Sequence, residues 1–123
     1  MSKYHSKKVT VDGITFDSRK EANRYKELSL LEKAGTISNL RRQVRYQLLP
    51  PAWEEYERYS DKTGKRLKNG RRCVEKGVTY VADFVYRRGL ETIVEDCKGH
   101  RTREYIIKKK LMRYFYGIEV QES

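Results

Sequence analysis

The chain has 123 residues, of which 37% are hydrophobic and 37% are charged, which allows one domain with a modest core. Its 28 lysines and arginines outweigh 17 aspartates and glutamates, and the formal net charge of +11 predicts a polyanionic partner, nucleic acid first. No apolar run reaches the roughly 20 residues of a membrane span, and no apolar signal segment begins the chain. The two cysteines, Cys73 and Cys97, form no CxxC pair, so neither a disulfide framework nor a structural zinc site is indicated. These features predict an intracellular, cytoplasmic protein that contacts no membrane.

The N-terminal part of the chain predicts a hairpin, a helix and a strand. Residues 7–16 alternate β-forming residues around an Asp-Gly pair, which is typical of a tight hairpin. Residues 17–35 have apolar side chains at helical spacing, with Ser18 three residues before Glu21 and a closing glycine, which predicts a helix of about four turns. Residues 39–49 alternate until two prolines end them, which predicts a strand with one wet face.

The C-terminal part predicts two central strands and a second helix. Residues 54–76 form a basic, exposed flap, interpreted as a long hairpin that turns near Gly64. Residues 78–99 contain two β-rich runs, and the first has apolar residues on both faces, which favours central strands. Residues 102–117 predict a helix, followed by a short strand, and its apolar stripe consists of Ile107, Leu111, Tyr114 and Phe115. The order predicts a single α/β domain with a mixed central β-sheet flanked by helices.

Two aspartates are expected to lie opposite each other on the central strands. If Gly89-Leu90 forms a two-residue turn, Asp83 lies directly opposite Asp96; a four-residue loop keeps this pairing, and a three-residue loop makes it diagonal. Like charges so placed destabilise a sheet unless something compensates them, and a divalent cation does so. By strand alternation Lys98 shares the face of Asp96.

These residue types suit a metal centre that hydrolyses phosphodiesters. Hard carboxylate oxygens favour Mg²⁺ or Mn²⁺, and the Lys98 ammonium could neutralise developing charge or orient the water. Glu95 is an alternative candidate acid. Only Asp96, two residues before Lys98, is expected to point to the same face of the strand as Lys98. The Cys97 side chain points away and fills the core, while its backbone carbonyl is a further candidate ligand.

The pattern of Asp83, then Asp96-Cys97-Lys98, preceded by Glu21 on a helix, resembles the PD-(D/E)XK nuclease superfamily. The chain outside the flap also resembles a family of small bacteriophage proteins placed in that superfamily, near Holliday-junction resolvases. Ala82 stands where the superfamily name has Pro. The resemblance implies a core like that of restriction endonucleases, Mg²⁺ or Mn²⁺ as cofactor, and Glu21, Asp83, Asp96 and Lys98 as catalytic residues. It further implies a phage or prophage origin, branched DNA as substrate and a C2 homodimer with two active sites.

Each candidate residue also has a plainer interpretation. Glu21 could only complete a capping box with Ser18, Asp83 and Asp96 could be surface carboxylates paired with lysine or arginine, and Lys98 could be solvated. Gln43 could reach the site's water, although a solvent-facing glutamine is the favoured interpretation. Thr102 is expected to cap the second helix, whose N-terminus could receive a phosphate. The residues expected to contact DNA are Lys62, Lys65, Arg66, Lys68, Arg71, Arg72, His100, Arg101, Thr102, Lys108 and Lys109.

The leading hypothesis is a metal-dependent DNA endonuclease that acts on branched DNA. One rival is a nicking or single-strand nuclease of phage packaging or replication, which a panel of DNA substrates separates from the first. The other is a non-catalytic nucleic-acid-binding protein, which uses the same charge without a metal and predicts that Asp83→Ala leaves activity untouched.

Overall fold

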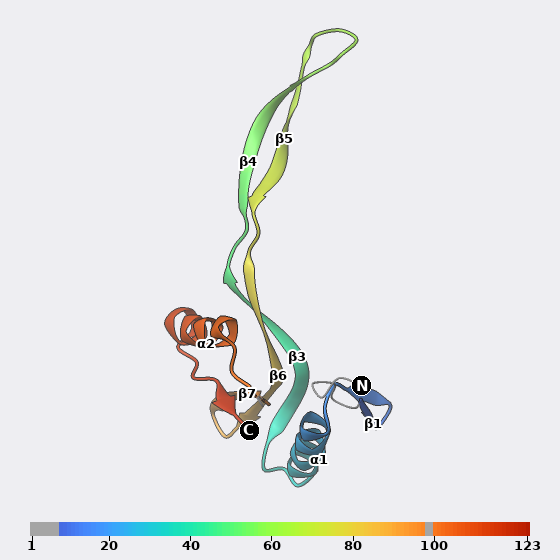
Figure 1. Ribbon diagram of the computed structural model, residues 1–123, viewed down its shortest axis with the longest axis vertical. Coiled ribbons are helices and arrows are strands. Elements are labelled where there is room, and N and C mark those ends of the chain that lie inside the picture. Colours follow the sequence, from blue (N-terminus) through green and yellow to red (C-terminus); the bar gives the residue numbers. More distant parts are fainter. Residues whose placement is uncertain (1–7, 98–99) are drawn as a thin grey trace.

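A four-stranded mixed sheet forms the centre of the fold (Figure 1). The computed structural model describes residues 8–97 and 100–123. The sheet has the order β3-β6-β7-β8, and its members are β3 (Ser38–Leu49), β6 (Val78–Arg88), β7 (Glu91–Asp96) and β8 (Gln121–Glu122). β3, β6 and β7 pair antiparallel, whereas β8 runs parallel to β7. The predicted α/β fold with a mixed sheet and two central strands is confirmed.

An N-terminal hairpin and helix α1 cover one side of the sheet. β1 (Val9–Val11) and β2 (Ile14–Phe16) pair antiparallel through a turn in which Asp12 and Gly13 both have positive φ, as predicted for an Asp-Gly hairpin. α1 (Arg19–Lys33) begins at Ser18, whose hydroxyl accepts the backbone N–H of Glu21 at 3.1 Å. The α1-side cluster of buried side chains consists of Phe16, Ala22, Leu28, Ile37, Phe84, Tyr86 and Ile93.

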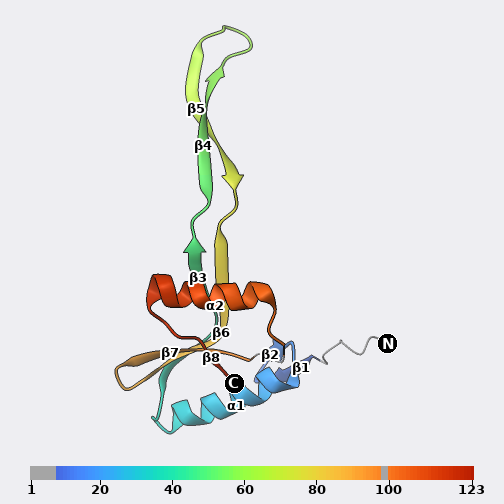
Figure 2. The same cartoon turned by 60° about the vertical axis from the view of Figure 1, so that its left-hand side comes forward.

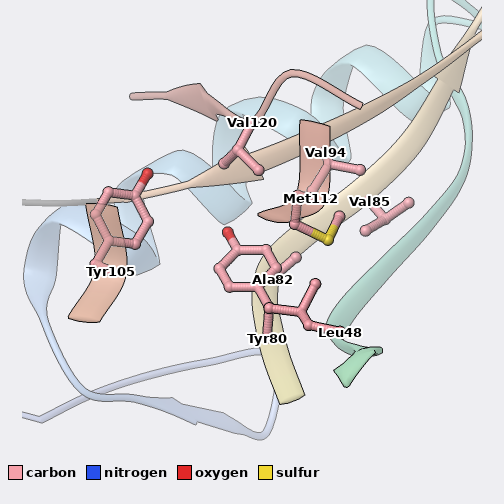
Figure 3. Close-up of a cluster of buried hydrophobic side chains, with 8 residues drawn as sticks. All are labelled: Leu48, Tyr80, Ala82, Val85, Val94, Tyr105, Met112 and Val120. Atoms are coloured by element: carbon pink, nitrogen blue, oxygen red, sulfur yellow. The ribbon is translucent and has the colours of Figure 1, made fainter. Parts of the chain in front are cut away.

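Helix α2 covers the other side of the sheet. α2 (Arg103–Tyr116) begins at Thr102 and ends at Gly117, as predicted. Figure 3 shows the α2-side cluster: Leu48, Tyr80, Ala82, Val85, Val94, Tyr105, Met112 and Val120. Neither helix of the described part of the chain is long and apolar enough to span a membrane.

Two details of the C-terminal region differ from the sequence prediction. The buried face of α2 carries Tyr105 and Met112, whereas the predicted stripe is largely exposed, with Ile107 at 56% and Tyr114 at 81%. Tyr105 and Met112 pack instead into the α2-side cluster, where the ring of Tyr105 contacts that of Tyr80 of β6. The final strand pairs only at residues 121–122, because the chain first turns from the end of α2 toward the edge of β7.

The predicted flap is a long two-stranded arm that projects from the body of the domain (Figures 1 and 2). β4 (Ala52–Tyr59) and β5 (Arg66–Glu75) pair antiparallel, and the arm comprises residues 52–75 with Gly64 at φ 69° in its turn. All residues of β4 are exposed, so the arm has no core of its own. Gly77 lies at its root, where a Cβ atom would stand 2.7 Å from the backbone oxygen of Leu49.

Side chains change sides of the sheet where Gln43 of β3 lies beside Asp83 of β6. Ala82 belongs to the α2-side cluster, whereas Phe84, two residues further, belongs to the α1-side cluster. Gln43 has φ 51°, and the ladder between the two strands has no pair at this position. Strand alternation is therefore interrupted at the residue that carries the first candidate acid.

Candidate functional site

The strands β6 and β7 separate at the candidate site. Their register runs from the turn at Gly89 to the pair Phe84–Glu95, in agreement with the predicted two-residue turn. The next expected pair, Asp83 with Asp96, is not formed. Instead, Asp83 Oδ2 accepts the backbone N–H of Cys97 at 2.9 Å. The predicted direct opposition of the two aspartates is therefore wrong, because the Asp83 carboxylate takes the backbone donor at the point where the ladder ends.

The carboxylates of Asp83 and Glu21 meet at the side chain of Gln43. The amide nitrogen of Gln43 lies 3.2 Å from Asp83 Oδ1 and 3.3 Å from Glu21 Oε1. The three residues come from β6, α1 and β3, so the site joins three elements that are distant in sequence. Glu21 is buried, Asp83 is half-buried and Gln43 is exposed, which leaves the site open to solvent on the Gln43 side.

The electrostatics of Glu21 reflect the neighbouring acid. Burial raises the pKa of Glu21, the charge of Asp83 raises it further, and Arg42 lowers it in part. Arg42 Nη2 lies 3.7 Å from Glu21 Oε1, and its guanidinium also stacks over the ring of Phe16. The plainer interpretation was that Ser18 and Glu21 form a capping box. Ser18 does cap α1, but the Glu21 carboxylate contacts Gln43 and Arg42.

Asp96 lies on the α2 side of the sheet. It is only 1% exposed, and its Oδ2 accepts the Tyr80 hydroxyl at 2.6 Å. Burial raises the pKa of Tyr80, and Asp96, Tyr105 and Asp83 raise it further. Figure 3 shows Tyr80 and Tyr105 side by side in the α2-side cluster. The charge of Asp83 thus acts on Glu21 on one side and on Tyr80 on the other.

Glu95, the alternative acid, is held in an ion pair with α1. Arg24 donates from Nε and Nη2 to the two carboxylate oxygens of Glu95, both at 2.7 Å, and Tyr86 donates its hydroxyl at 3.0 Å. Glu95 is 3% exposed and faces away from Asp96. Its charge is therefore balanced by Arg24 of α1, the helix that also carries Glu21.

The remaining candidate residues, Cys97 and Lys98, follow β7 in the sequence. Lys98 lies outside the described residues. Cys97 is half-buried against the α1-side cluster, and its Sγ lies 3.1 Å from Ser123 Oγ. Burial raises the pKa of the Cys97 thiol, so it is a poor thiolate ligand.

The carboxylates supply part of a metal site. Among residues 8–97 and 100–123, no three His, Cys, Asp or Glu side chains are arranged to hold a metal ion. Glu21 and Asp83 nevertheless present two carboxylate oxygens to one point. Mg²⁺ typically takes one or two carboxylates and completes its octahedral shell with water and phosphate oxygens. The donor set fits such an ion, with Glu21 and Asp83 as its direct ligands.

The cations predicted to contact DNA in the flap lie on the arm. All of them are exposed: Lys62, Lys65, Arg66, Lys68, Arg71 and Arg72. Arg72 forms an ion pair of 2.6 Å with Glu54, and the Arg71 guanidinium lies 5.0 Å from the ring centre of Trp53. Around the tip of the arm, Lys62, Lys65 and Lys68 form no ion pair with any part of the chain that the structure describes. The lysines of the arm therefore cluster around its tip without an ion-pair partner among the described residues.

The second group of predicted DNA contacts surrounds the start of α2. His100 and Arg101 are exposed, and Thr102 Oγ1 accepts the N–H of Tyr105 at 3.1 Å, which confirms the predicted cap. Glu122 accepts hydrogen bonds from Arg101, Tyr105 and Lys109. Burial of Glu122 raises its pKa, but these three donors outweigh burial and lower it.

Carboxylates of the chain thus balance part of the charge of this second group. Lys108 pairs with Glu104 at 3.0 Å, as Lys109 does with Glu122 at 3.2 Å.

Sequence reasoning did not assign Tyr80 or Arg24, and it favoured solvent for Gln43. Tyr80 occupies a core position of β6, where alternation alone gives no reason to expect a polar partner. Arg24 is one of many cations of a basic helix. For Gln43 the available signal was its place on the polar side of β3, which is also the side expected for a solvated glutamine.

A family model described as "Protein of unknown function (DUF1064)" matches residues 1–122. The chain belongs to the DUF1064 family. Comparison with curated proteins and with solved structures gave no match.

Proposed function

We propose that this member of the DUF1064 family is a metal-dependent deoxyribonuclease that cleaves branched DNA. The observation that supports the proposal most strongly is the meeting of Glu21 and Asp83 at one nitrogen of Gln43. Two carboxylates so close together repel each other, and burial together with this repulsion raises the pKa of Glu21. A divalent cation bound by both carboxylates relieves such repulsion.

The chain's own residues would bind the ion and the reacting phosphate group. Glu21 and Asp83 hold the ion, and the Cys97 N–H orients Asp83 from its other oxygen. Asp96, held by Tyr80, lies next to the same strand end. When bound, Mg²⁺ or Mn²⁺ supplies Lewis acidity and an activated water. Lys98 directly follows this point in the sequence, and its ammonium neutralises charge that develops on the phosphate.

The arm and the start of α2 would contact the DNA backbone. The exposed lysines around the arm tip provide sequence-independent phosphate contacts at a distance from the carboxylates. A two-stranded ribbon is also narrow enough to enter a major groove. Cleavage of both strands at a branch requires two active sites, which a C2 homodimer provides.

The test is a cleavage assay with labelled four-way junction, nicked duplex, linear duplex and single-stranded DNA, each with Mg²⁺, Mn²⁺ or EDTA. We expect junction cleavage that requires metal and that falls at least 100-fold in Asp83→Asn, Glu21→Gln and Lys98→Ala. Glu91→Gln, a change at an exposed carboxylate beside the turn between β6 and β7, serves as the matched control and retains cleavage.

The substrate panel also separates the rival functions. Preference for nicked or single-stranded DNA would replace the resolvase assignment with that of a nicking or single-strand nuclease. Metal-independent cleavage, or full activity in all three site variants, would reject the mechanism. Tight binding to every substrate without cleavage under any condition would favour a non-catalytic nucleic-acid-binding protein.

A further inference from the structure

We infer that the amide of Gln43 occupies the cation position of the metal-free site and moves away when a divalent ion binds. This inference rests on the proposed function, because it concerns the regulation of that same site. It assigns Gln43 a role that goes beyond packing: its NH₂ group acts as an internal substitute for the ion, and its carbonyl oxygen becomes available to the ion or its water.

The contacts of the amide support the first half of this inference. One nitrogen donates to Glu21 Oε1 at 3.3 Å and to Asp83 Oδ1 at 3.2 Å, and an amide NH₂ has one hydrogen for each acceptor. The opposite orientation would direct the carbonyl oxygen at two carboxylates and leave both without a donor, so the hydrogen-bond network fixes the orientation. The partially positive NH₂ group therefore lies where the two acids converge.

The backbone holds the amide at this point by an unusual conformation. Gln43 has φ 51°, a left-handed conformation that a non-glycine residue adopts at a cost. Side chains of both β3 and β6 change sides of the sheet here, so the interruption of alternation directs Gln43 toward Glu21 and Asp83. A glutamine that merely faced solvent would require neither feature.

The surroundings allow the amide to leave. Gln43 is exposed, whereas Glu21 is buried and Asp83 is half-buried, so the acids stay in place while the amide has room on its solvent side. An amide carbonyl is a hard oxygen donor of the kind that Mg²⁺ accepts directly or through water. Rotation about the terminal bond of the side chain exchanges the NH₂ group for this oxygen without any change in the backbone.

Charge-changing variants of Gln43 test the inference through metal binding and stability. In Gln43→Lys a permanent cation lies between the acids: we expect a melting temperature in EDTA at or above that of the wild type and Mn²⁺ binding at least about tenfold weaker in calorimetry. In Gln43→Glu a third carboxylate joins the pair: we expect a lower melting temperature in EDTA and a larger rise on addition of Mn²⁺. Both variants keep a non-glycine residue at φ 51°, so the backbone cost is the same.

The matched controls are Gln47→Lys and Gln47→Glu, at an exposed glutamine of the same strand. We expect both controls to bind Mn²⁺ as the wild type does. If Gln43→Lys binds Mn²⁺ as tightly as the wild type, or if the variants at 43 and 47 behave alike in EDTA, the role of Gln43 is refuted while the proposed function stands. If the wild type itself shows no Mn²⁺ binding, the metal-dependent function fails, and the cation substitute fails with it.

Discussion

Arg24 of α1 holds Glu95 of β7 through two hydrogen bonds of 2.7 Å, one to each carboxylate oxygen. Glu95 is 3% exposed, and Tyr86 supplies its third donor. A guanidinium that meets a carboxylate in this two-pronged way fixes both the distance and the orientation of its partner. The pair therefore fixes α1, which carries Glu21, to the strand that carries Asp96.

We predict that Arg24→Met lowers the free energy of unfolding by about 2–3 kcal/mol, because Glu95 stays buried without its cation. The loss is smaller than for a fully buried pair, since the Arg24 side chain is 26% exposed and Tyr86 remains as a donor. Urea denaturation measures the change. The double variant Arg24→Met with Glu95→Gln removes the uncompensated charge and should recover part of the stability; no recovery would contradict the buried-charge explanation.

Tyr80→Phe is predicted to lower the free energy of unfolding by about 1–3 kcal/mol, because it removes a buried donor to the Asp96 carboxylate. Tyr105→Phe is the comparison, since the Tyr105 hydroxyl donates to the more exposed Glu122. We expect the Tyr105 change to cost less. Thermal unfolding in EDTA measures both, and equal losses would show that the Tyr80–Asp96 contact has no special strength.

Gly77→Ala is predicted to destabilise the protein by about 1–3 kcal/mol, because its Cβ atom meets the backbone oxygen of Leu49 at 2.7 Å and the ring of Pro51 at 3.1 Å. Gly70→Ala, within the arm, brings a Cβ to 2.4 Å from the ring of Tyr56. That ring ends an exposed side chain that can turn away, so the cost should be smaller. Chemical denaturation of both variants provides the check, and a larger loss for Gly70→Ala would refute this ranking.

The sequence predicted the fold well where one local signal decides the structure. The Asp-Gly turn, the Ser18 and Thr102 caps and the Gly89 turn each depend on a few adjacent residues. The register between β6 and β7 then followed from the length of that turn alone.

The site was harder to predict because it depends on contacts between distant elements. The register set by the turn placed Asp83 opposite Asp96, but the ladder between β6 and β7 ends one pair earlier, and the conformation of Gln43 on the neighbouring strand interrupts alternation at Asp83. The residues near Asp83 in the sequence do not predict that interruption, because it arises where β3 pairs with β6. Likewise, the buried face of α2 is decided by the fit of Tyr105 over Tyr80, which the spacing of apolar residues does not reveal.

Substitution of Lys62, Lys65 and Lys68 by alanine is predicted to weaken DNA binding and to reduce its salt dependence. Each lysine that contacts a phosphate contributes about 0.9 to the slope of log affinity against log salt, so the triple variant should lose about 2–3. Lys26 and Lys33, exposed on α1, provide a control pair whose replacement should leave the slope unchanged. Fluorescence anisotropy over a salt series measures the slope. An unchanged slope in the triple variant would remove the arm tip from the DNA-binding surface.

The last prediction concerns the pH dependence of the metal-free protein. Burial and the charge of Asp83 raise the pKa of Glu21 above its ordinary value of 4.5, so the folded state holds this proton more tightly than the unfolded state does. The stability that the protonated group contributes is fully present below pH 4.5 and is lost as the pH rises through the raised pKa. Glu21→Gln cannot ionise, so its stability should fall less over this range, whereas Glu91→Gln, exposed beside the turn, should follow the wild type.

Urea denaturation in EDTA, from about pH 4 to about pH 8, measures these curves. Saturating Mn²⁺ should reverse the trend in the wild type, because metal binding requires the ionised carboxylate and adds stability as the proton leaves. The Gln variant lacks that carboxylate and should gain little from the metal at any pH. Parallel curves for the wild type and Glu21→Gln in EDTA would show that the pKa of Glu21 is not raised. That result would contradict the effect of burial and of the Asp83 charge on Glu21.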